Sequence, residues 1–374
     1  NPPEQFEQQP RLSPQAIETP NVPAAQAPAG ASVITFPLAG ITYEGLTVYT
    51  PEQLAPIYAD RIGQTVSLAE VYEIAAKLTA KYRNDGYILT QVVVPPQTID
   101  GGAVRLQVVE GFVDNITVEG EGLTASERNQ IAAYANRVKG QPLNTRNLEQ
   151  AVLLTNDLPG ISVRGILSPS AATAGASDLR IVVERKSYNA EVGIDNYGSL
   201  YLGRLEGYAA AAANSLMGMN ERIATTLVYA PDDFLEKEIA YGDLTYTQPI
   251  GSWGTKLEVS GAVTSTNPGF DLAQFKVNGQ SVLLSAKVIQ PIVRTRAFNW
   301  SVYGLFDWRN VNTQSNIDPT RHDRIAAFRL GTKLDRLDSF LGGGFNTLTI
   351  EAARGVDLFG ASDKGDANMA RAAT

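Results

Sequence analysis

The fold of this chain is predicted first by residues 86–111, GYILTQVVVPPQTIDGGAVRLQVVEG. Two runs within it are rich in β-branched residues, ILTQVVV at 88–94 and AVRLQVVEG at 103–111, and each is predicted to be a strand. Two prolines and an Asp-Gly-Gly turn separate the runs. Proline cannot donate to a sheet and glycine adopts turn conformations at low cost, so the chain is expected to leave one strand here and return in the next.

The residues before this strand pair predict one further strand and two helices. The strand ends in ITYEG, and a helix begins at Pro51, a residue type that suits the first helical turn. A second helix is predicted over 67–85, because Ser67 and Glu70 have the spacing of a capping box. The unit therefore has the order β-α-α-β-β and is assigned to residues 33–111.

The same unit is repeated in the next part of the chain. ITVEG at 116–120 matches ITYEG at 41–45, and LTNDLPGISV matches YRNDGYILT. A second small domain is therefore predicted over residues 112–186. A Pro-rich lead segment, residues 1–32, precedes both domains and is predicted to be disordered. The second domain is predicted to contain two helices and two further strands, at 125–137, 144–156, 161–168 and 178–186.

After residue 186 the hydrophobic pattern has a period of two. Tyr188, Val192 and Ile194 alternate with polar residues, and about nine such segments follow within residues 187–374. Each segment is close to the ~9–11 residues that a tilted strand needs to cross a bilayer. The pattern predicts the first part of an antiparallel transmembrane β-barrel. A soluble β-sandwich is the alternative, since it also alternates and has polar loops.

The connections between these segments alternate in length. Compact connections at 213–220, 248–254 and 290–297 alternate with longer polar connections at 265–278 and 310–323. Outer-membrane barrels have tight turns on the periplasmic side and longer loops outside, so this alternation favours the barrel. Tyrosines and tryptophans near strand ends suggest aromatic girdles at the two membrane interfaces.

The composition excludes several classes of function. The formal net charge is -8, so the chain has no positive excess with which to bind nucleic acid. It contains no cysteine, so thiolate metal sites and disulfides are excluded. No run of apolar residues approaches the ~18 that predict a membrane-spanning helix.

The sequence shows no pattern typical of an enzyme. The motifs GxSxG, GxGxxG and GxxxxGK[ST] are absent, so acyl transfer and nucleotide binding lack their usual backbone devices. The single histidine, His322, lies in the polar string DPTRHDR and is expected to be an exposed loop residue. No catalytic, cofactor or metal site is predicted, and no nucleotide partner.

Residues 86–111 closely resemble the first polypeptide-transport-associated (POTRA) domain of two-partner secretion transporters, the ShlB-type haemolysin secretion/activation family. The resemblance covers Gly86 and Tyr87, the Pro-Pro-Gln break at 95–97 and the strand end at Glu110. It continues through the second domain into GIDNYGS at 193–199, which is similar to the first barrel strand and hairpin of that family.

This resemblance implies α+β tandem POTRA domains before a barrel, in the outer membrane with residues 1–186 in the periplasm. It implies that an unfolded exported client, large and β-rich, is recognised by the POTRA domains and passed to the cell surface (type V secretion). The family barrel is similar in having sixteen strands, so the chain is expected to be truncated at its C-terminus. The family's VRG-type pore-loop motif is then expected beyond Thr374. The alternatives are a barrel-assembly factor of the same superfamily and, in another class, a porin or enzyme.

A client-binding site is predicted in the first repeat. An open sheet edge can accept an extended client as an added strand, and the prolines at 95 and 96 suggest that strand 88–94 lies near an edge. In the alternative interpretation, the helix residues of this site only pack the domain core. The residues assigned to the site are Ile88, Leu89, Thr90, Gln91 and Val92 on the strand and Val71, Ile74 and Leu78 on the helix.

Overall fold

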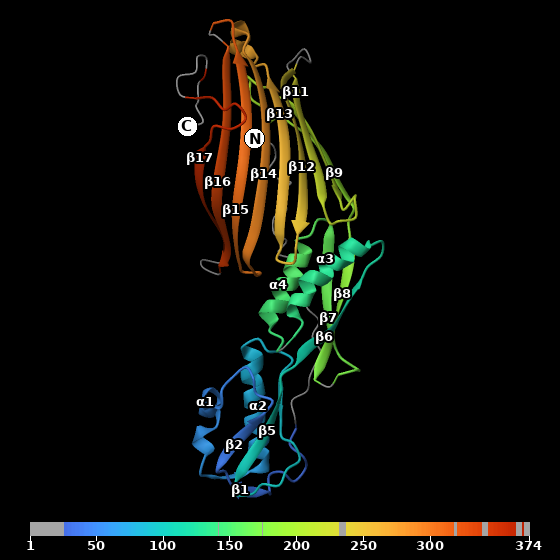
Figure 1. Ribbon diagram of the computed structural model, residues 1–374, viewed down its shortest axis with the longest axis vertical. Coiled ribbons are helices and arrows are strands. Elements are labelled where there is room, and N and C mark those ends of the chain that lie inside the picture. The colour runs from blue at the N-terminus through green and yellow to red at the C-terminus, as the bar shows by residue number, and fades with distance from the viewer. Residues whose placement is uncertain are drawn as a thin grey trace.

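The computed structural model describes residues 26–140, 142–173, 175–231, 237–317, 320–338, 343–363 and 369. Three parts follow one another along its long axis (Figure 1). Two small α/β units lie end to end, and a large antiparallel sheet follows the second unit. Most of the predicted lead segment, residues 1–25, lies outside the described residues. Ala31 is already buried in the first unit, so ordered structure begins before the predicted boundary at residue 33.

The first unit has a three-stranded sheet of order β2-β5-β4, in which β2 is parallel to β5 and β4 is antiparallel to it. A short pair, β1 with β3, lies beside it. The helix predicted at Pro51 is one turn long and continues as 3-10 turns. The elements are β1 (Thr35–Pro37), β2 (Gly40–Glu44), α1 (Pro51–Leu54), η2 (Ala55–Ile57), η3 (Ala59–Arg61), β3 (Thr65–Ser67), α2 (Leu68–Asn84), β4 (Gln91–Val93) and β5 (Ala103–Val109).

The long helix α2 begins where the sequence predicted. The Ser67 hydroxyl accepts from the Glu70 N–H at 3.2 Å, and the Glu70 carboxylate accepts from the Ser67 N–H at 2.7 Å. This capping box satisfies two N–H groups that a helix start leaves unpaired. One face of α2 then packs on the sheet and forms the first core together with Leu54, Val104 and Leu106.

The second unit repeats this arrangement, with a sheet of order β6-β8-β7. Thr124 caps the first helix in a second capping box, and Asn144 caps the next helix. The β-α-α-β-β repeat predicted from the sequence is therefore confirmed. The elements are β6 (Phe112–Glu119), α3 (Ala125–Ala135), η4 (Asn136–Val138), α4 (Thr145–Asn156), β7 (Ile161–Pro169) and β8 (Ala176–Arg185).

The two units share a tight joint. Leu89, from the first repeat, is buried in the core of the second unit, and Ile88 packs against that core. Two backbone hydrogen bonds of 2.9 Å also cross the joint, from Leu143 N–H to the Gly111 carbonyl and from Thr145 N–H to the Gly86 carbonyl. A Cβ atom on Gly111 would lie 2.6 Å from Cβ of Leu89, so a side chain at this position would displace Leu89, which packs in the second core.

In the described part of the chain, nine strands form the large sheet, in the order β17-β16-β15-β14-β13-β12-β11-β10-β9, and every neighbouring pair is antiparallel. The number agrees with the prediction of about nine. Within the described residues the sheet is open, with β9 and β17 at its edges. The strands are β9 (Tyr188–Asp195), β10 (Glu206–Asn214), β11 (Arg222–Pro231), β12 (Lys237–Ile250), β13 (Thr255–Thr266), β14 (Asn278–Arg294), β15 (Phe298–Gln314), β16 (Arg321–Asp338) and β17 (Gly344–Gly355).

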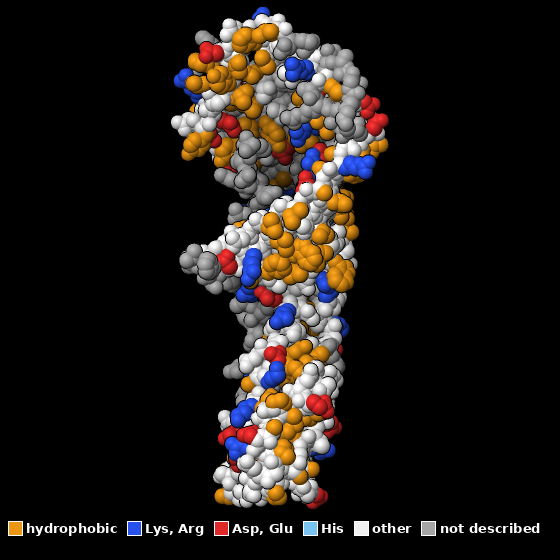
Figure 2. Space-filling model, turned by 90° about the vertical axis from the view of Figure 1, so that its left-hand side faces the viewer, with side chains coloured by type: hydrophobic (Ala, Val, Ile, Leu, Met, Phe, Trp, Pro, Cys, Tyr) orange, Lys and Arg blue, Asp and Glu red, His pale blue; other side chains and the backbone are white. Residues whose placement is uncertain are grey.

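The two faces of this sheet differ sharply in chemistry. The strand register places a continuous set of exposed apolar side chains on one face, which we call the outer face. The other, inner face carries polar and charged residues such as Asp243, Glu258 and Asp307. In Figure 2, patches of hydrophobic side chains (orange) lie in the upper part of the molecule, at the level of the large sheet in Figure 1. The outer face includes Val192, Ile194, Leu227, Tyr229, Leu244, Val259, Val263, Leu284, Val288, Trp300, Phe328, Leu330, Leu348 and Ile350.

The strands are longer than the sequence indicated, because β12 and β14 continue through the repeated QPI strings. Pro249 pairs with Lys256 inside the sheet, and β14 accommodates Pro291 at a bulge. The compact connections therefore shrink to 215–221, 251–254 and 295–297, and all three lie against the second unit. At the far end, the connection 267–277 contains η5 (Phe270–Phe275). The predicted long connection 310–323 is wrong, because β15 and β16 extend into it and leave only 315–320, which is shorter than the turn 215–221. His322, expected in that loop, is exposed but lies at the start of β16. None of the described helices is both long and apolar enough to span a bilayer.

This arrangement predicts the accessibility of single cysteines, which the chain otherwise lacks. A cysteine at exposed Ile317, in the far-end connection, should react with a membrane-impermeant thiol reagent on intact cells. A cysteine at Ser252, beside the second unit, should react only after the outer membrane is permeabilised. Labelling of Ser252 but not of Ile317 on intact cells would mean that the orientation is reversed.

Candidate functional site

Strand β4 is an edge strand, as the prediction of a docking edge requires, but its outer side is already occupied. The N–H of Val92 donates to the hydroxyl of Thr79 on α2 at 2.9 Å, and this hydroxyl donates to the Ala75 carbonyl at the same distance. A client strand added here would have to displace Thr79. The predicted strand 88–94 is also reduced to Gln91–Val93, because residues 87–90 turn toward the second unit.

The residues assigned to client binding fall into three groups. Val71, Ile74 and Leu78 are buried in the first core, as the alternative interpretation expected. Ile88 and Leu89 belong to the joint between the units. Thr90, Gln91 and Val92 remain at the edge, where Thr90 is buried and its N–H donates to the Tyr87 carbonyl. The eight residues therefore do not form one surface, and client binding at the edge residues stays a prediction.

A groove lies beside the end of β4, next to Pro95 and Pro96. In the sequence, these two prolines were the only indication of a binding edge in this region. The groove has a volume of about 490 Å³ and is bordered by β1, by the first turns of α2 and by the segment 94–99. Its floor and walls are largely apolar, and Ile34 at its rim is 52 % exposed. The main lining side chains are Ile34, Phe36, Leu68, Tyr72, Val94 and Ile99.

At the other end of the first unit, Glu110 binds the loop that precedes α1 through hydrogen bonds. Its carboxylate accepts from the N–H groups of Thr47 and Val48, both at 3.0 Å, from the Thr47 hydroxyl, and from the Tyr82 hydroxyl at 2.7 Å. Burial alone would raise the pKa of Glu110, but the hydrogen bonds from Thr47, Val48 and Tyr82 outweigh it and hold the pKa below its usual value.

This lowered pKa predicts the pH dependence of the first unit. A carboxyl group whose pKa falls on folding contributes stability above its ordinary value of 4.5, and the contribution is lost as the pH falls below it. Wild type should therefore be more stable than Glu110→Gln at pH 7. The difference in stability between the two proteins should shrink as the pH falls below 4.5, the ordinary pKa of a glutamate. Thermal unfolding of both proteins across this range measures it. A difference that grows as the pH falls would contradict the assignment.

The inner face of the large sheet carries a network of paired charges. The Arg329 guanidinium contacts Asp307 at 2.5 Å and Glu351 at 3.1 Å, and the Tyr303 hydroxyl donates to Glu351 at 2.8 Å. The Lys287 ammonium lies over the Tyr303 ring, 4.5 Å from its centroid. These residues come from four adjacent strands. The network gives this face a hydrophilic wall in which the charges are mutually compensated.

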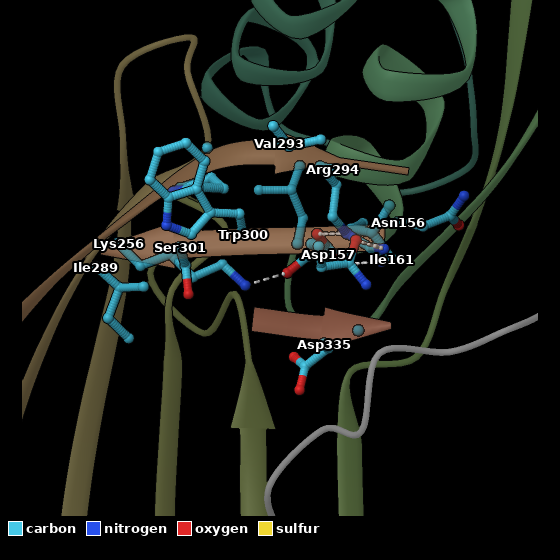
Figure 3. Close-up of a pocket in the computed structure, with 15 residues that line it drawn as sticks. Asn156, Asp157, Ile161, Lys256, Ile289, Val293, Arg294, Trp300, Ser301 and Asp335 are labelled. Carbon is cyan, nitrogen blue, oxygen red and sulfur yellow. Dashed lines mark hydrogen bonds and ion pairs between the residues drawn. The ribbon is translucent and has the colours of Figure 1, made fainter. Parts of the chain in front are cut away.

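The second unit is fastened to the near end of the sheet, at the junction shown in Figure 3. Asp157 follows α4 and accepts two hydrogen bonds from Arg294 at the end of β14, from Nε at 2.7 Å and from Nη2 at 2.8 Å. Lys256 donates to the Asp157 carbonyl at 2.9 Å. A cavity of about 220 Å³, lined also by Trp300 and Asp335, lies beside this pair.

Further contacts widen this junction. Arg296 pairs with Glu149 of α4 at 3.1 Å, and the Arg137 guanidinium lies 4.0 Å from the ring centroid of Trp253. Sequence reasoning did not find the junction, because its partners are about a hundred or more residues apart. Asp157 is the one local signal, since an acidic residue at a helix C-terminus is opposed by the helix dipole. Among the described residues no cluster of side chains is suited to hold a metal ion.

Comparison with known proteins identifies this combination of α/β units and sheet. The family model described as haemolysin secretion/activation protein ShlB/FhaC/HecB matches residues 175–373. The chain belongs to this family. A second model, the ShlB-type POTRA domain, matches residues 36–111, which is the first α/β unit. The ShlB/FhaC/HecB match begins at the last strand of the second unit and covers the large sheet.

Relatives within the ShlB/FhaC/HecB family are transporters rather than enzymes. Heme/hemopexin transporter protein HuxB of Haemophilus influenzae (strain 86-028NP) is 24% identical over 279 residues, which are 73% of this chain and 48% of HuxB. Hemolysin transporter protein HpmB of Proteus mirabilis is 25% identical over 221 residues, 58% of this chain and 37% of HpmB. The chain thus spans about half the length of the HuxB relative that it matches.

Solved structures show the same fold. CdiB from Escherichia coli superposes with a TM-score of 0.71 at 20% identity, covering 93% of this chain and 65% of that one. CdiB from Acinetobacter baumannii superposes with a TM-score of 0.57 at 17% identity, covering 91% of this chain and 67% of that one. The ShlB/FhaC/HecB chain is an outer-membrane protein with periplasmic POTRA units. An apolar outer face such as that of its sheet is typical of the lipid-facing surface of a membrane β-barrel.

Proposed function

We propose that this chain acts in two-partner (type V) secretion, as an outer-membrane transporter that takes an exported protein client from the periplasm and passes it to the cell surface. The observation that carries the proposal is the continuous arrangement of the three parts. Two POTRA units are joined tightly and are fastened to the periplasmic turns of a sheet with an apolar outer face and a polar inner face. Such a sheet supplies a hydrophilic wall along which an unfolded chain can pass.

We further propose that the client is a large, β-rich secreted protein and that the chain has no catalytic activity of its own. The relatives' names mention hemopexin and haemolysin, which suggests a separate secreted partner for this chain also. An extended segment of such a partner can bind through main-chain hydrogen bonds with little demand on its sequence. Outer-membrane lipid is the second partner, through the apolar outer face.

The proposed division is a lead segment (1–32), a first POTRA domain (33–111), a second POTRA domain (112–186) and the barrel region (187–374). Two separate hydrophobic cores support the division between the POTRA domains. Leu89 crosses this division, since it lies in the first repeat by sequence and in the second core by packing. We therefore regard the two POTRA domains as one rigid arm.

Within this arm we propose that the client docks in the groove beside β4 rather than on the outer side of β4. The groove is apolar and open to solvent, whereas the outer N–H of β4 is held by Thr79. An apolar groove next to a sheet edge suits an amphipathic extended segment, which buries alternate side chains. Ile34 and Tyr72, which the sequence did not single out, are then the contact residues.

A pair of neighbouring residues tests this proposal. Ile34 lines the groove, whereas Val33 points elsewhere and is 81 % exposed. Ile34→Asp should reduce client secretion several-fold because it places a charge where an apolar side chain must be buried. Val33→Asp is the matched control and should secrete at the wild-type level. Client in the culture medium is measured by immunoblot, and the amount of heat-modifiable transporter in the outer membrane shows whether each variant is folded.

Three outcomes would separate the alternatives. Equal secretion by the folded Ile34 and Val33 variants would eliminate the groove as the docking site. Loss of other outer-membrane proteins on deletion of the gene, with secretion intact, would indicate a barrel-assembly factor instead. Leakage of small solutes as the main effect of the protein would indicate a porin.

A further inference from the structure

The turn between β10 and β11, residues 215–221 with the sequence SLMGMNE, exposes an unusual amount of apolar surface. Leu216, Met217 and Met219 are 60 %, 53 % and 42 % exposed. Tight turns are normally built from polar residues and glycine. Three large apolar side chains gathered in one seven-residue turn form a patch of the kind that marks an interaction site.

The turn is held in a fixed shape. The carboxylate of Glu221, which is fully buried, accepts from Met217 N–H at 2.5 Å and from Met219 N–H at 3.0 Å. The Ser215 N–H donates to the Glu221 carbonyl at 2.6 Å, and the Asn220 N–H donates to the Ser215 hydroxyl at 2.9 Å. Ser215 and Asn220 both adopt left-handed backbone conformations, with φ of 55° and 57°. The contacts outweigh the strain of these conformations, so the apolar side chains are presented by a rigid loop.

The apolar side chains continue the lipid-facing surface at its periplasmic margin. Gln248, on the outer face of β12, donates to the Met219 carbonyl at 3.0 Å and accepts from the Tyr246 hydroxyl at 2.6 Å. Tyr246 pairs across the sheet with Ile223, the second residue of β11. Exposed Tyr188, at the start of β9, lies on the same face opposite Ala213. Tyrosines at this level are typical of the membrane interface.

The opposite side of the turn holds the second POTRA unit. The Thr124 hydroxyl, which caps α3, donates to the Gly218 carbonyl at 2.7 Å, and Arg185 donates to the Ser215 carbonyl at 2.9 Å. A Cβ atom on Gly218 would lie 2.7 Å from the Thr124 methyl group, so only glycine permits this approach. The turn therefore connects the lipid-facing margin of the sheet with the start of α3.

We propose that turn 215–221 is a membrane anchor, in which Leu216, Met217 and Met219 insert at the headgroup and acyl-chain boundary of the periplasmic leaflet. Methionine suits this place because its flexible, polarisable side chain adapts to an irregular lipid surface. Burial of these side chains in the leaflet offsets the exposure of apolar area to water. Through Thr124 and Arg185 the anchor sets the position of the second POTRA unit relative to the membrane.

The absence of cysteine allows a direct test. The protein, purified from outer membranes with Met217→Cys, is labelled with an environment-sensitive fluorophore and reconstituted in phosphatidylethanolamine/phosphatidylglycerol vesicles that contain a lipid spin-labelled close to the headgroup. Leu227→Cys on the outer face is the lipid-exposed control, and Glu121→Cys, exposed on the second unit, is the water-exposed control. The label at 217 should be quenched by the spin-labelled lipid as at 227, and several-fold less by iodide than at 121.

Two other results would overturn the proposal. Iodide quenching at 217 equal to that at 121 would place the turn in water, and shielding from both quenchers would mean that protein covers it. Leu216→Ser with Met219→Ser, with the label kept at 217, should raise iodide quenching several-fold. Unchanged quenching in this folded variant would show that the apolar side chains do not hold the turn in the leaflet. Heat-modifiable mobility confirms that each variant has folded.

Discussion

Asp157→Ala is expected to destabilise the protein by about 3–5 kcal/mol, because it leaves the Arg294 guanidinium buried without its counter-charge. The Arg294 side chain is only 8 % exposed, and Asp157 accepts two of its hydrogen bonds. The Thr295 carbonyl and the Asn299 side chain remain as acceptors, at 3.2 and 2.9 Å, which favours the lower end of this range. Removing an acidic group from a helix C-terminus would by itself stabilise α4 slightly, so a loss of stability must come from the junction.

Denaturant unfolding of the reconstituted protein measures this effect, and hydrogen exchange in α4 locates it. Glu149→Ala is the matched control, because it breaks a more exposed ion pair with Arg296 in the same junction and should cost less than about 1 kcal/mol. Combining Asp157→Ala with Arg294→Met should recover most of the loss, because no buried charge is left unpaired. If Asp157→Ala and Glu149→Ala cost the same, the Asp157–Arg294 pair does not hold the junction.

Leu330→Arg is expected to cost about 2–4 kcal/mol, the penalty for an arginine on the lipid face of a barrel near the bilayer midplane. Leu330 is 72 % exposed on the outer face and pairs with Gly304, midway between Trp300 and Trp308 on β15. Val302 lies on the same outer face of β15 but nearer its periplasmic end, beside residues that line the junction cavity. Leu330 is therefore the better midplane position.

Leu305→Arg is the control, because Leu305 is the same residue type on the neighbouring strand but lies on the inner face between Lys287 and Arg329. Water and the carboxylates of Asp307 and Glu351 are available there, so the cost should be smaller than at Leu330. Folding of both variants into lipid vesicles, followed by denaturant titration, compares them. A larger penalty at Leu305 would mean that the two faces are assigned the wrong way round.

The sequence by itself determined the repeated α/β units, a sheet of about nine strands and the alternation that gives each strand one apolar and one polar face. These features depend on local chemistry. Capping at Ser67 and Thr124 starts helices within a few residues, and alternation with a period of two divides each strand into two faces wherever it is placed. The resemblance at 86–111 identified the family for the same reason, since one short segment carries it.

Only the tertiary structure decided which residues form the joints and the groove. The sequence pattern assigns Leu89 to a strand of the first repeat, yet its side chain packs in the second core. Thr79 belongs to a helix, yet its hydroxyl accepts the outward-facing N–H of β4. Asp157 and Arg294 meet across 137 positions of sequence. Such contacts follow from how whole units pack, and packing depends on the shapes of surfaces assembled from distant segments. Periodicity and capping report only neighbours along the chain, so they predicted the parts of this protein and not the contacts that join them.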